Sequence, residues 1–161
     1  MAGRAPDAEA MRYRRARVMR AAKWVAALLL GAAVPAALVA FALGSVGIFL
    51  PAVAITLGHA IVLGVPTALL YRRLKWRSPA FALAGGFLIG ALPAGLYFWP
   101  VDPRHGTNAW TGTTQTLLDG VPTWAGWVEY MQMLGGFGCL GTLGAIAFWL
   151  TLKLTGELRV Q

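Results

Sequence analysis

Charged side chains are scarce in this sequence. They make up 12% of its 161 residues, while 58% of the residues are hydrophobic. Soluble domains carry about 25% charged residues, which cover their water-facing surface. So low a charge content indicates a membrane protein, and the length fits a single domain.

Cysteine is also scarce, and the common catalytic motifs are absent. The one cysteine, Cys139, lies in an apolar segment. It cannot form an intramolecular disulfide, so we interpret it as a small packing residue. The sequence has no phosphate-binding loop, HExxH, CxxC or GxSxG motif. Without these motifs we expect no bound cofactor and favour a protein that is not an enzyme.

Long apolar segments, in contrast, are abundant. A spanning helix takes about 20 mostly apolar residues. Four segments meet this requirement, at 24–43, 46–70, 79–99 and 131–152. We therefore expect an all-α integral membrane protein whose four transmembrane helices pack as a four-helix bundle. The loop at 100–130 is longer than most connections in compact folds.

Lysine and arginine are distributed very unevenly around these segments. Of the 14 basic residues, only Arg104 falls in the loop between the third and fourth spans. Basic loops resist translocation, so both termini should be cytoplasmic and the protein should lie in the inner (plasma) membrane. This topology divides the chain into a basic segment (1–23), a transmembrane domain (24–154) and a cytoplasmic tail (155–161).

The basic N-terminal segment accounts for much of the net charge of +8. We predict that residues 8–23 form a basic helix lying on anionic headgroups, to which each base contributes about 1 kcal/mol near the surface. No nucleic-acid motif is present, so we do not expect a nucleic-acid partner. The residues AFA at 40–42 allow a signal peptide, but the preceding apolar stretch is too long, which favours an uncleaved first helix.

Small residues recur at helical spacing in every span. Burying leucine does not drive helices together in lipid, whereas close backbone approach through small residues does. The first span has Ala32, Ala36, Ala40 and Gly44 at a spacing of four. The glycines that we assign to helix packing are Gly64, Gly86, Gly90, Gly138, Gly141 and Gly144. Packing within one chain is the simpler interpretation, and self-association or docking on a partner is the alternative.

A histidine, His59, lies near the centre of the second span. Thr56 and Thr67 share its side of the helix at about 100° per residue, and Thr142 lies at a similar depth in the fourth span. These four residues form the candidate intramembrane polar site.

We consider a structural and a functional role for His59, with contact to a ligand or haem as a third alternative. The structural role is one hydrogen bond to a threonine or to a carbonyl freed by a proline such as Pro35 or Pro93. The functional role is a protonatable group on a transport path. The other histidine, His105, falls in the outer loop, so one bundle cannot offer a bis-histidine haem site.

The outer loop shows a helical period near its end. Apolar residues recur at intervals of three and four, at Leu117, Val121, Trp124, Val128 and Met131. This period predicts a short amphipathic helix, capped by Thr123, that lies in the outer interface and leads into the fourth span.

Four polar residues of this loop are weak candidates for a metal or acid–base site: Asp102, His105, Asp119 and Glu129. Their spacing matches no recognised ligand pattern.

Three hypotheses follow for the function. The first is a non-enzymatic subunit or scaffold that works through helix packing, either as a homo-oligomer or with a membrane-protein partner. The second is a small transport module that uses His59. The third, and the least favoured, is a membrane enzyme with a site in the outer loop.

Overall fold

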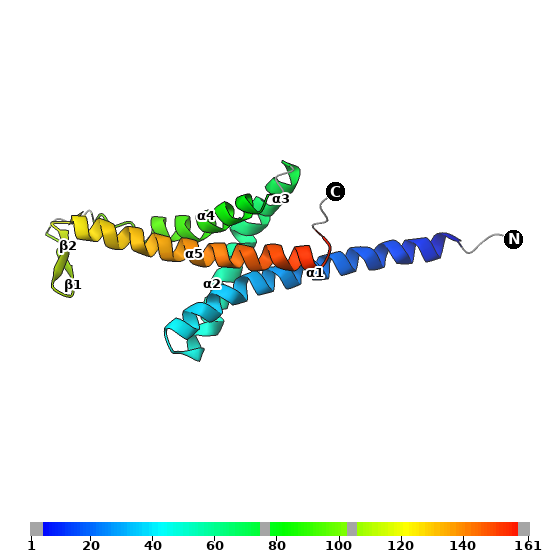
Figure 1. The fold of residues 1–161 in the computed structure, drawn as a ribbon, viewed down its shortest axis with the longest axis horizontal. Helices are drawn as coiled ribbons and strands as arrows, with labels where there is room; N and C mark the ends of the chain where they lie inside the picture. The colour runs from blue at the N-terminus through cyan, green and yellow to red at the C-terminus, as the bar shows by residue number, and fades with distance from the viewer. Residues whose placement is uncertain (1–4, 75–77, 103–105, 158–161) are drawn as a thin grey trace. The chain divides into compact units, whose positions relative to one another are not determined.

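The computed structural model describes residues 5–74, 78–102 and 106–157. Helices dominate this part of the chain (Figure 1). In order, the elements are α1 (Ala5–Ala42), a 3-10 turn η1 (Val46–Ile48), α2 (Phe49–His59), a π-helical turn η2 (Ala60–Gly64), α3 (Val65–Arg73), α4 (Pro79–Tyr97), β1 (Ala109–Thr111), β2 (Thr114–Leu118), β3 (Val121–Pro122) and α5 (Trp124–Leu154).

Four helical stretches are long and apolar enough to cross a membrane, which confirms that part of the prediction. They are Glu9–Ala42, Val46–Tyr71, Pro79–Tyr97 and Trp124–Leu154. The first stretch differs from the expected one, because α1 is continuous from Ala5. The basic segment is therefore the first half of the same helix that forms the apolar span.

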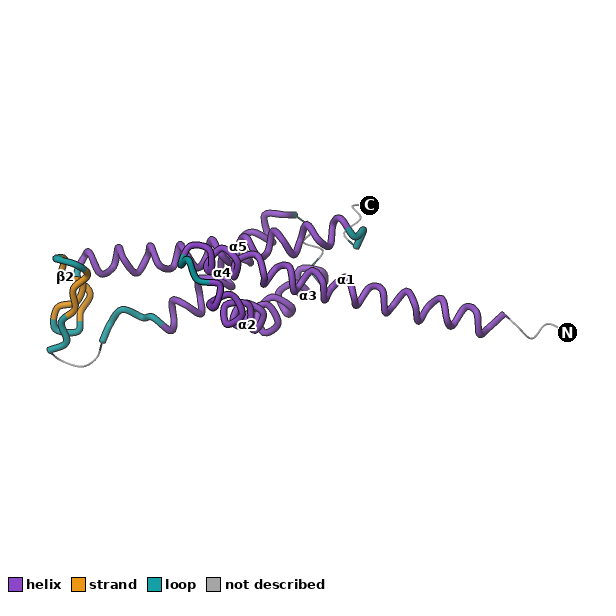
Figure 2. Tube along the Cα trace, turned by 90° about the horizontal axis from the view of Figure 1, so that it is seen from below, coloured by secondary structure: helices purple, strands orange, loops and turns teal. Residues whose placement is uncertain are grey.

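The predicted helix is wrong for residues 117–122, which form the end of β2, a turn and β3. β1, β2 and β3 make an antiparallel sheet in that order (Figure 2). Asp119 and Gly120 join β2 to β3 with φ values of 49° and 81°. Asp-Gly is a preferred pair for a two-residue hairpin turn, and this local preference overrides the helical period of the apolar residues.

The predicted cap at Thr123 is confirmed, and the helix that it starts is α5 itself. The Thr123 hydroxyl oxygen accepts a hydrogen bond from the Gly126 N–H at 3.2 Å. Ser78 caps α4 in the same way, accepting from the Ala80 N–H at 3.3 Å, and Pro79 occupies the first turn. Both caps satisfy N–H groups that have no partner within the helix.

The contacts divide the chain into two compact units. Unit 1 comprises residues 1–61 and 144–161, and unit 2 comprises residues 62–143. Unit 1 contains α1, α2 and the C-terminal part of α5. Unit 2 contains α3, α4, the sheet and the N-terminal part of α5.

In unit 1, α1 packs antiparallel to the end of α5. The closest approach is at Gly31 and Gly144, where a methyl group added to Gly144 would lie 2.7 Å from the Gly31 carbonyl oxygen. This is the carbonyl that Pro35 leaves without an N–H donor. Trp24 packs edge-on against Phe148, with 5.6 Å between ring centroids. Both contacts depend on the absence of a side chain at the glycines.

The other contact of α1 is with α2, through a tight hairpin. Gly44 ends α1 with φ +60°, while Ser45 N–H donates to the Ala40 carbonyl and Gly44 N–H to the Phe41 carbonyl, both at 3.0 Å. This is a Schellman cap, so Gly44 serves as a turn residue. The alanines of the predicted stripe are buried: Ala32, Ala36 and Ala40 are 1%, 0% and 9% exposed.

In unit 2, α4 packs antiparallel to the first part of α5 through glycines. A methyl group at Gly141 would collide with the Gly86 carbonyl oxygen, and one at Gly90 with the Phe137 carbonyl oxygen. Gly138 accommodates the ring of Phe87. The backbones of the two helices are thus in direct contact along this row.

The stretch Val46–Tyr71 is interrupted in its middle. The π turn Ala60–Gly64 directly follows His59 and ends just before Pro66. Proline lacks an N–H, and its ring collides with the carbonyl four residues earlier, here that of Val62. We attribute the local widening of the helix to Pro66, because such a turn moves that carbonyl away from the ring.

The glycine row gives a matched pair of substitutions in α5. Gly141→Ala should lower the free energy of unfolding by about 1–3 kcal/mol, because the new methyl group meets the backbone of α4. In the monomeric chain, Gly135→Ala should be neutral or stabilising, since no other part of the chain lies within 4 Å of the added group and alanine favours the helix. Unfolding of both variants in mixed micelles, followed by circular dichroism, measures the difference. Equal stabilities would contradict the close contact.

Candidate functional site

His59, at the C-terminal end of α2, is the main polar group of the candidate intramembrane site. Its Nδ1 lies 2.8 Å from the carbonyl oxygen of Ile55, one turn earlier in the same helix. The predicted bond to a proline-freed carbonyl or a threonine is therefore replaced by a bond within α2. No other hydrogen bond of this side chain is found among the described residues.

The bond to Ile55 determines which ring nitrogen of His59 carries the proton in the neutral form. A carbonyl oxygen can only accept, so Nδ1 must be the donor. Nε2 then bears a lone pair and is an acceptor. The ring thus presents, from the apolar stretch Val46–Tyr71, a nitrogen that can accept a hydrogen bond or a proton.

Thr56 lies one turn before the π turn and connects α2 to α1. Its hydroxyl oxygen is 2.9 Å from the Ala32 carbonyl of α1 and also 2.9 Å from the Ala52 carbonyl of its own helix. The single hydroxyl proton is shared between these two acceptors. Thr56 is the member of the predicted polar site that bridges two helices of unit 1.

The other two threonines belong to unit 2, so the four predicted residues are divided between the units. The Thr67 hydroxyl donates to the Leu63 carbonyl of the same helical stretch at 2.7 Å. The Thr142 hydroxyl donates to the Gly138 carbonyl at 3.0 Å and lies 3.5 Å from the Leu83 carbonyl of α4. No hydrogen bond joins any two of the four residues in the described chain.

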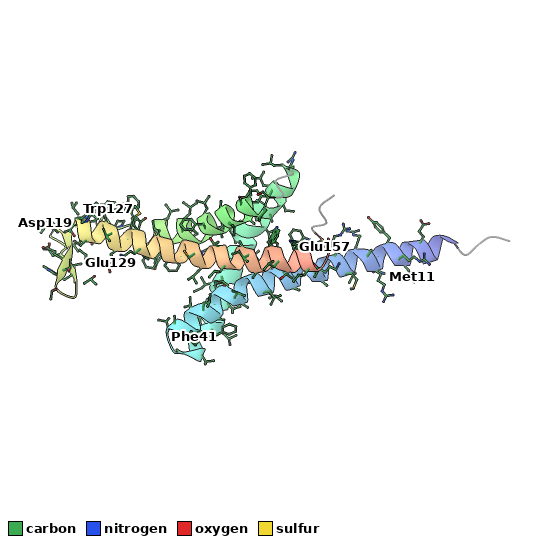
Figure 3. The ribbon with its side chains drawn as sticks, in the orientation of Figure 1. Met11, Phe41, Asp119, Trp127, Glu129 and Glu157 are labelled. Atoms are coloured by element: carbon green, nitrogen blue, oxygen red, sulfur yellow. The ribbon has the colours of Figure 1, made fainter. Side chains whose placement is uncertain are left out.

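Three of the four outer-loop candidates lie in the described part of unit 2, and His105 lies outside the described residues. Glu129 accepts a hydrogen bond from the Thr111 hydroxyl, 3.1 and 3.2 Å from its two carboxylate oxygens. Asp119 occupies the β2–β3 turn, where its N–H donates to the Asn108 side chain at 3.1 Å. Figure 3 labels both carboxylates.

These contacts hold the sheet together and attach it to α5. Asp102 joins the sheet through its N–H, which donates to the Gly120 carbonyl at 3.0 Å. Within the described residues, no group of three or more histidine, cysteine, aspartate and glutamate side chains is arranged to hold a metal ion. Glu129 and the backbone of Asp102 thus have architectural roles in this loop.

Two clusters were not anticipated from the sequence. The first is in unit 2, beside the first turns of α5, where the rings of Trp99, Trp127 and Tyr130 meet edge to face at centroid distances of 5.9–6.2 Å. The Tyr130 hydroxyl donates to the Gly95 carbonyl at 2.8 Å, and the side chain is buried. The mutual contacts of these rings depend on the pairing of α4 with α5.

The second cluster joins the start of the apolar part of α1 to the end of α5, and we call it the terminal clasp. Lys23 Nζ donates to the Thr155 carbonyl at 2.8 Å and lies 3.4 Å from Glu157, which also lies 3.5 Å from Arg20. Gly156, with φ +76°, turns the chain so that Glu157 N–H donates to the Leu152 carbonyl at 3.0 Å. The glycine near the end of the last helix is the sequence signal for this Schellman cap.

Comparisons with known proteins add no assignment: no family model, no curated protein and no solved structure matches this chain.

Proposed function

We propose that the chain is a multi-pass protein of the inner (plasma) membrane and works as a non-enzymatic subunit or scaffold through helix packing. The observation that carries this proposal is the stretch Val46–Tyr71. It is 26 residues long, and no residue of its most apolar 18-residue window is buried within the chain. Such a helix needs lipid or the helices of another protein around it.

Open glycines favour another helix at part of this surface. A methyl group at Gly58 of α2, or at Gly135 or Gly136 of α5, would meet nothing within 4 Å. Glycine destabilises a helix by about 1 kcal/mol relative to alanine. In the proposed complex, a further helix packs closely against these glycines, as α4 packs against Gly141. This packing offsets the cost of glycine to the stability of the helix.

The proposed orientation places both termini in the cytoplasm. The antiparallel pairing of α1 with α5 in unit 1 puts Lys23 beside Thr155, at the same end of the pair. This arrangement agrees with an even number of spans and with basic residues gathered on one side.

Reporter fusions test this orientation. A fusion after residue 75 should be active only as a cytoplasmic reporter, and a fusion after residue 115 only as an external one, because the helix Pro79–Tyr97 lies between them. Paired alkaline phosphatase and green fluorescent protein fusions measure the two compartments. Placement of both positions in the same compartment would refute the topology.

The association itself is tested with bulky substitutions at the open glycines. Native-membrane nanodiscs should contain a defined oligomer or a stoichiometric complex, as determined by light scattering. Gly58→Leu and Gly135→Leu should dissociate it by at least about tenfold, which is about 1.4 kcal/mol, and leave the helical content unchanged. Leu92→Phe, at an exposed position of α4, is the matched control. A wild-type monomer, or equal effects of all three substitutions, would contradict the proposal.

A second candidate function is a small transport module that uses His59. The supporting observation is the bond of Nδ1 to Ile55, which leaves Nε2 as an acceptor within an apolar helix. A proton is the simplest cargo for such a nitrogen. The adjoining π turn adds weight, since π turns are frequent at functional sites.

Proton flux into proteoliposomes tests this second function. His59→Phe should abolish flux that is driven by a membrane potential, because the ring then has no nitrogen to protonate. Thr67→Val removes a hydroxyl from the same helical stretch and should keep the flux. Equal flux in wild type and His59→Phe would exclude a transport role for His59.

A further inference from the structure

The helix α1 is about twice as long as a bilayer core requires. Its apolar part, from Trp24 to Ala42, spans about 28 Å at about 1.5 Å per residue, close to the hydrocarbon thickness of about 30 Å. The part from Ala5 to Lys23 continues the same helix for about another 28 Å. Figures 1 and 2 show this part extending past the end of α5, its partner in unit 1.

This basic arm, residues 5–22, has no means of bending sharply toward the membrane. Sharp helix bends occur at proline, glycine or inserted turns, and none of these is present between Asp7 and Leu30. The terminal clasp fixes the base of the arm, through Lys23 on Thr155 and Arg20 on Glu157. With the proposed topology, the arm therefore projects into the cytoplasm, and the prediction that it lies on headgroups does not fit this geometry.

The positive charges of the arm surround the helix. At about 100° per residue, its arginines leave no sector wider than about 100° without a positive charge; they are Arg12, Arg14, Arg15, Arg17 and Arg20. Every residue from 9 to 22 is exposed, including Met11, which is 67% exposed and is labelled in Figure 3. Helices that lie on membranes have one apolar face. In the arm, Met11, Val18 and Met19 share one side of the helix, but Arg15 lies among them, so this side also carries a positive charge.

We propose that the basic arm binds duplex DNA by docking into the major groove without sequence preference. This proposal replaces the expectation from the sequence that no nucleic acid is bound, which rested on the lack of a motif. It rests on the proposed topology only for the placement of the arm in the cytoplasm. A major groove about 12 Å wide admits an α-helix and places phosphates on both sides of it. A partner with phosphates on both sides of the helix can contact arginines on several faces of the helix at the same time. A flat anionic bilayer or an acidic protein face would contact one side only.

The charge spacing and the choice of arginine agree with this partner. Five arginines occur between positions 12 and 20, or one per about 2.5 Å of helix, against one phosphate per about 1.7 Å of duplex axis. The planar guanidinium binds phosphate oxygens through two hydrogen bonds, which the ammonium of lysine does not. Contacts to phosphate carry no sequence information, so the binding should be non-specific.

The test uses the whole protein in nanodiscs of zwitterionic lipid, titrated into a fluorescent DNA duplex and followed by anisotropy. Nanodiscs expose both faces, so the result does not depend on the topology in the cell. With about four phosphate contacts, affinity should fall about 100-fold between 50 and 200 mM salt. Replacing Arg12, Arg14, Arg15 and Arg17 together by glutamine should weaken binding at least about tenfold and remove most of the salt dependence.

The matched control also removes four positive charges, through Arg72→Gln, Arg73→Gln, Lys153→Gln and Arg159→Gln, and should keep the wild-type affinity. Equal losses in the two variants would show attraction by net charge alone and overturn the proposal. Equal affinity for an A-form RNA duplex, whose major groove does not admit a helix, would also overturn it. Displacement of DNA by poly-glutamate at equal charge would identify an acidic protein as the fitting partner instead.

Discussion

Direct contact between helix backbones is the constraint on which the rest of this structure depends. In hydrocarbon, association of apolar side chains contributes little, because lipid tails are equally apolar. Gly31 meets Gly144 in unit 1, and Gly90 meets Gly141 in unit 2, with no side chain between the helices. These contacts set the register in which larger groups meet, such as Trp24 with Phe148 and Tyr130 with the Gly95 carbonyl.

Polar groups within the apolar helices are mostly satisfied close by in sequence. The hydroxyls of Thr67 and Thr151 donate to carbonyls one turn earlier, and His59 uses Ile55 in the same way. Such bonds remove the cost of an unpaired polar group but say little about which helices pair. Thr56, with its bond to Ala32, is an exception, so the choice of helix partner rests largely on shape.

The features that the sequence predicts best are those that depend on local properties. Hydropathy and length identify the four apolar helices, and Thr123 ahead of α5 is a recognisable cap. The sheet is not predicted, because the apolar period near Leu117 favours a helix, whereas the Asp119–Gly120 turn decides the structure. The continuity of α1 also has a sequence signal, namely the lack of glycine and proline between Asp7 and Leu30. The positive charge of this segment instead favours a separate helix on the bilayer surface.

Other features depend on three-dimensional placement and have no local signal. The sequence shows that His59 and Pro35 lie in apolar segments. It does not show that the His59 ring bonds to the Ile55 carbonyl of its own helix. Nor does it show that the carbonyl freed by Pro35 lies against Gly144. Pairing of side chains from distant segments, as in the terminal clasp, follows only once the helices are in register.

The terminal clasp has a consequence for the order of folding. Chains emerge from the ribosome N-terminus first, yet Lys23 of the first apolar helix bonds to Thr155, which is 132 residues further along. Until α5 has been made, the Lys23 ammonium group cannot bond to Thr155, and Gly144 does not yet cover the Gly31 carbonyl. Unit 1 therefore becomes complete only after residue 155 has been translated, so its assembly is a late event in folding.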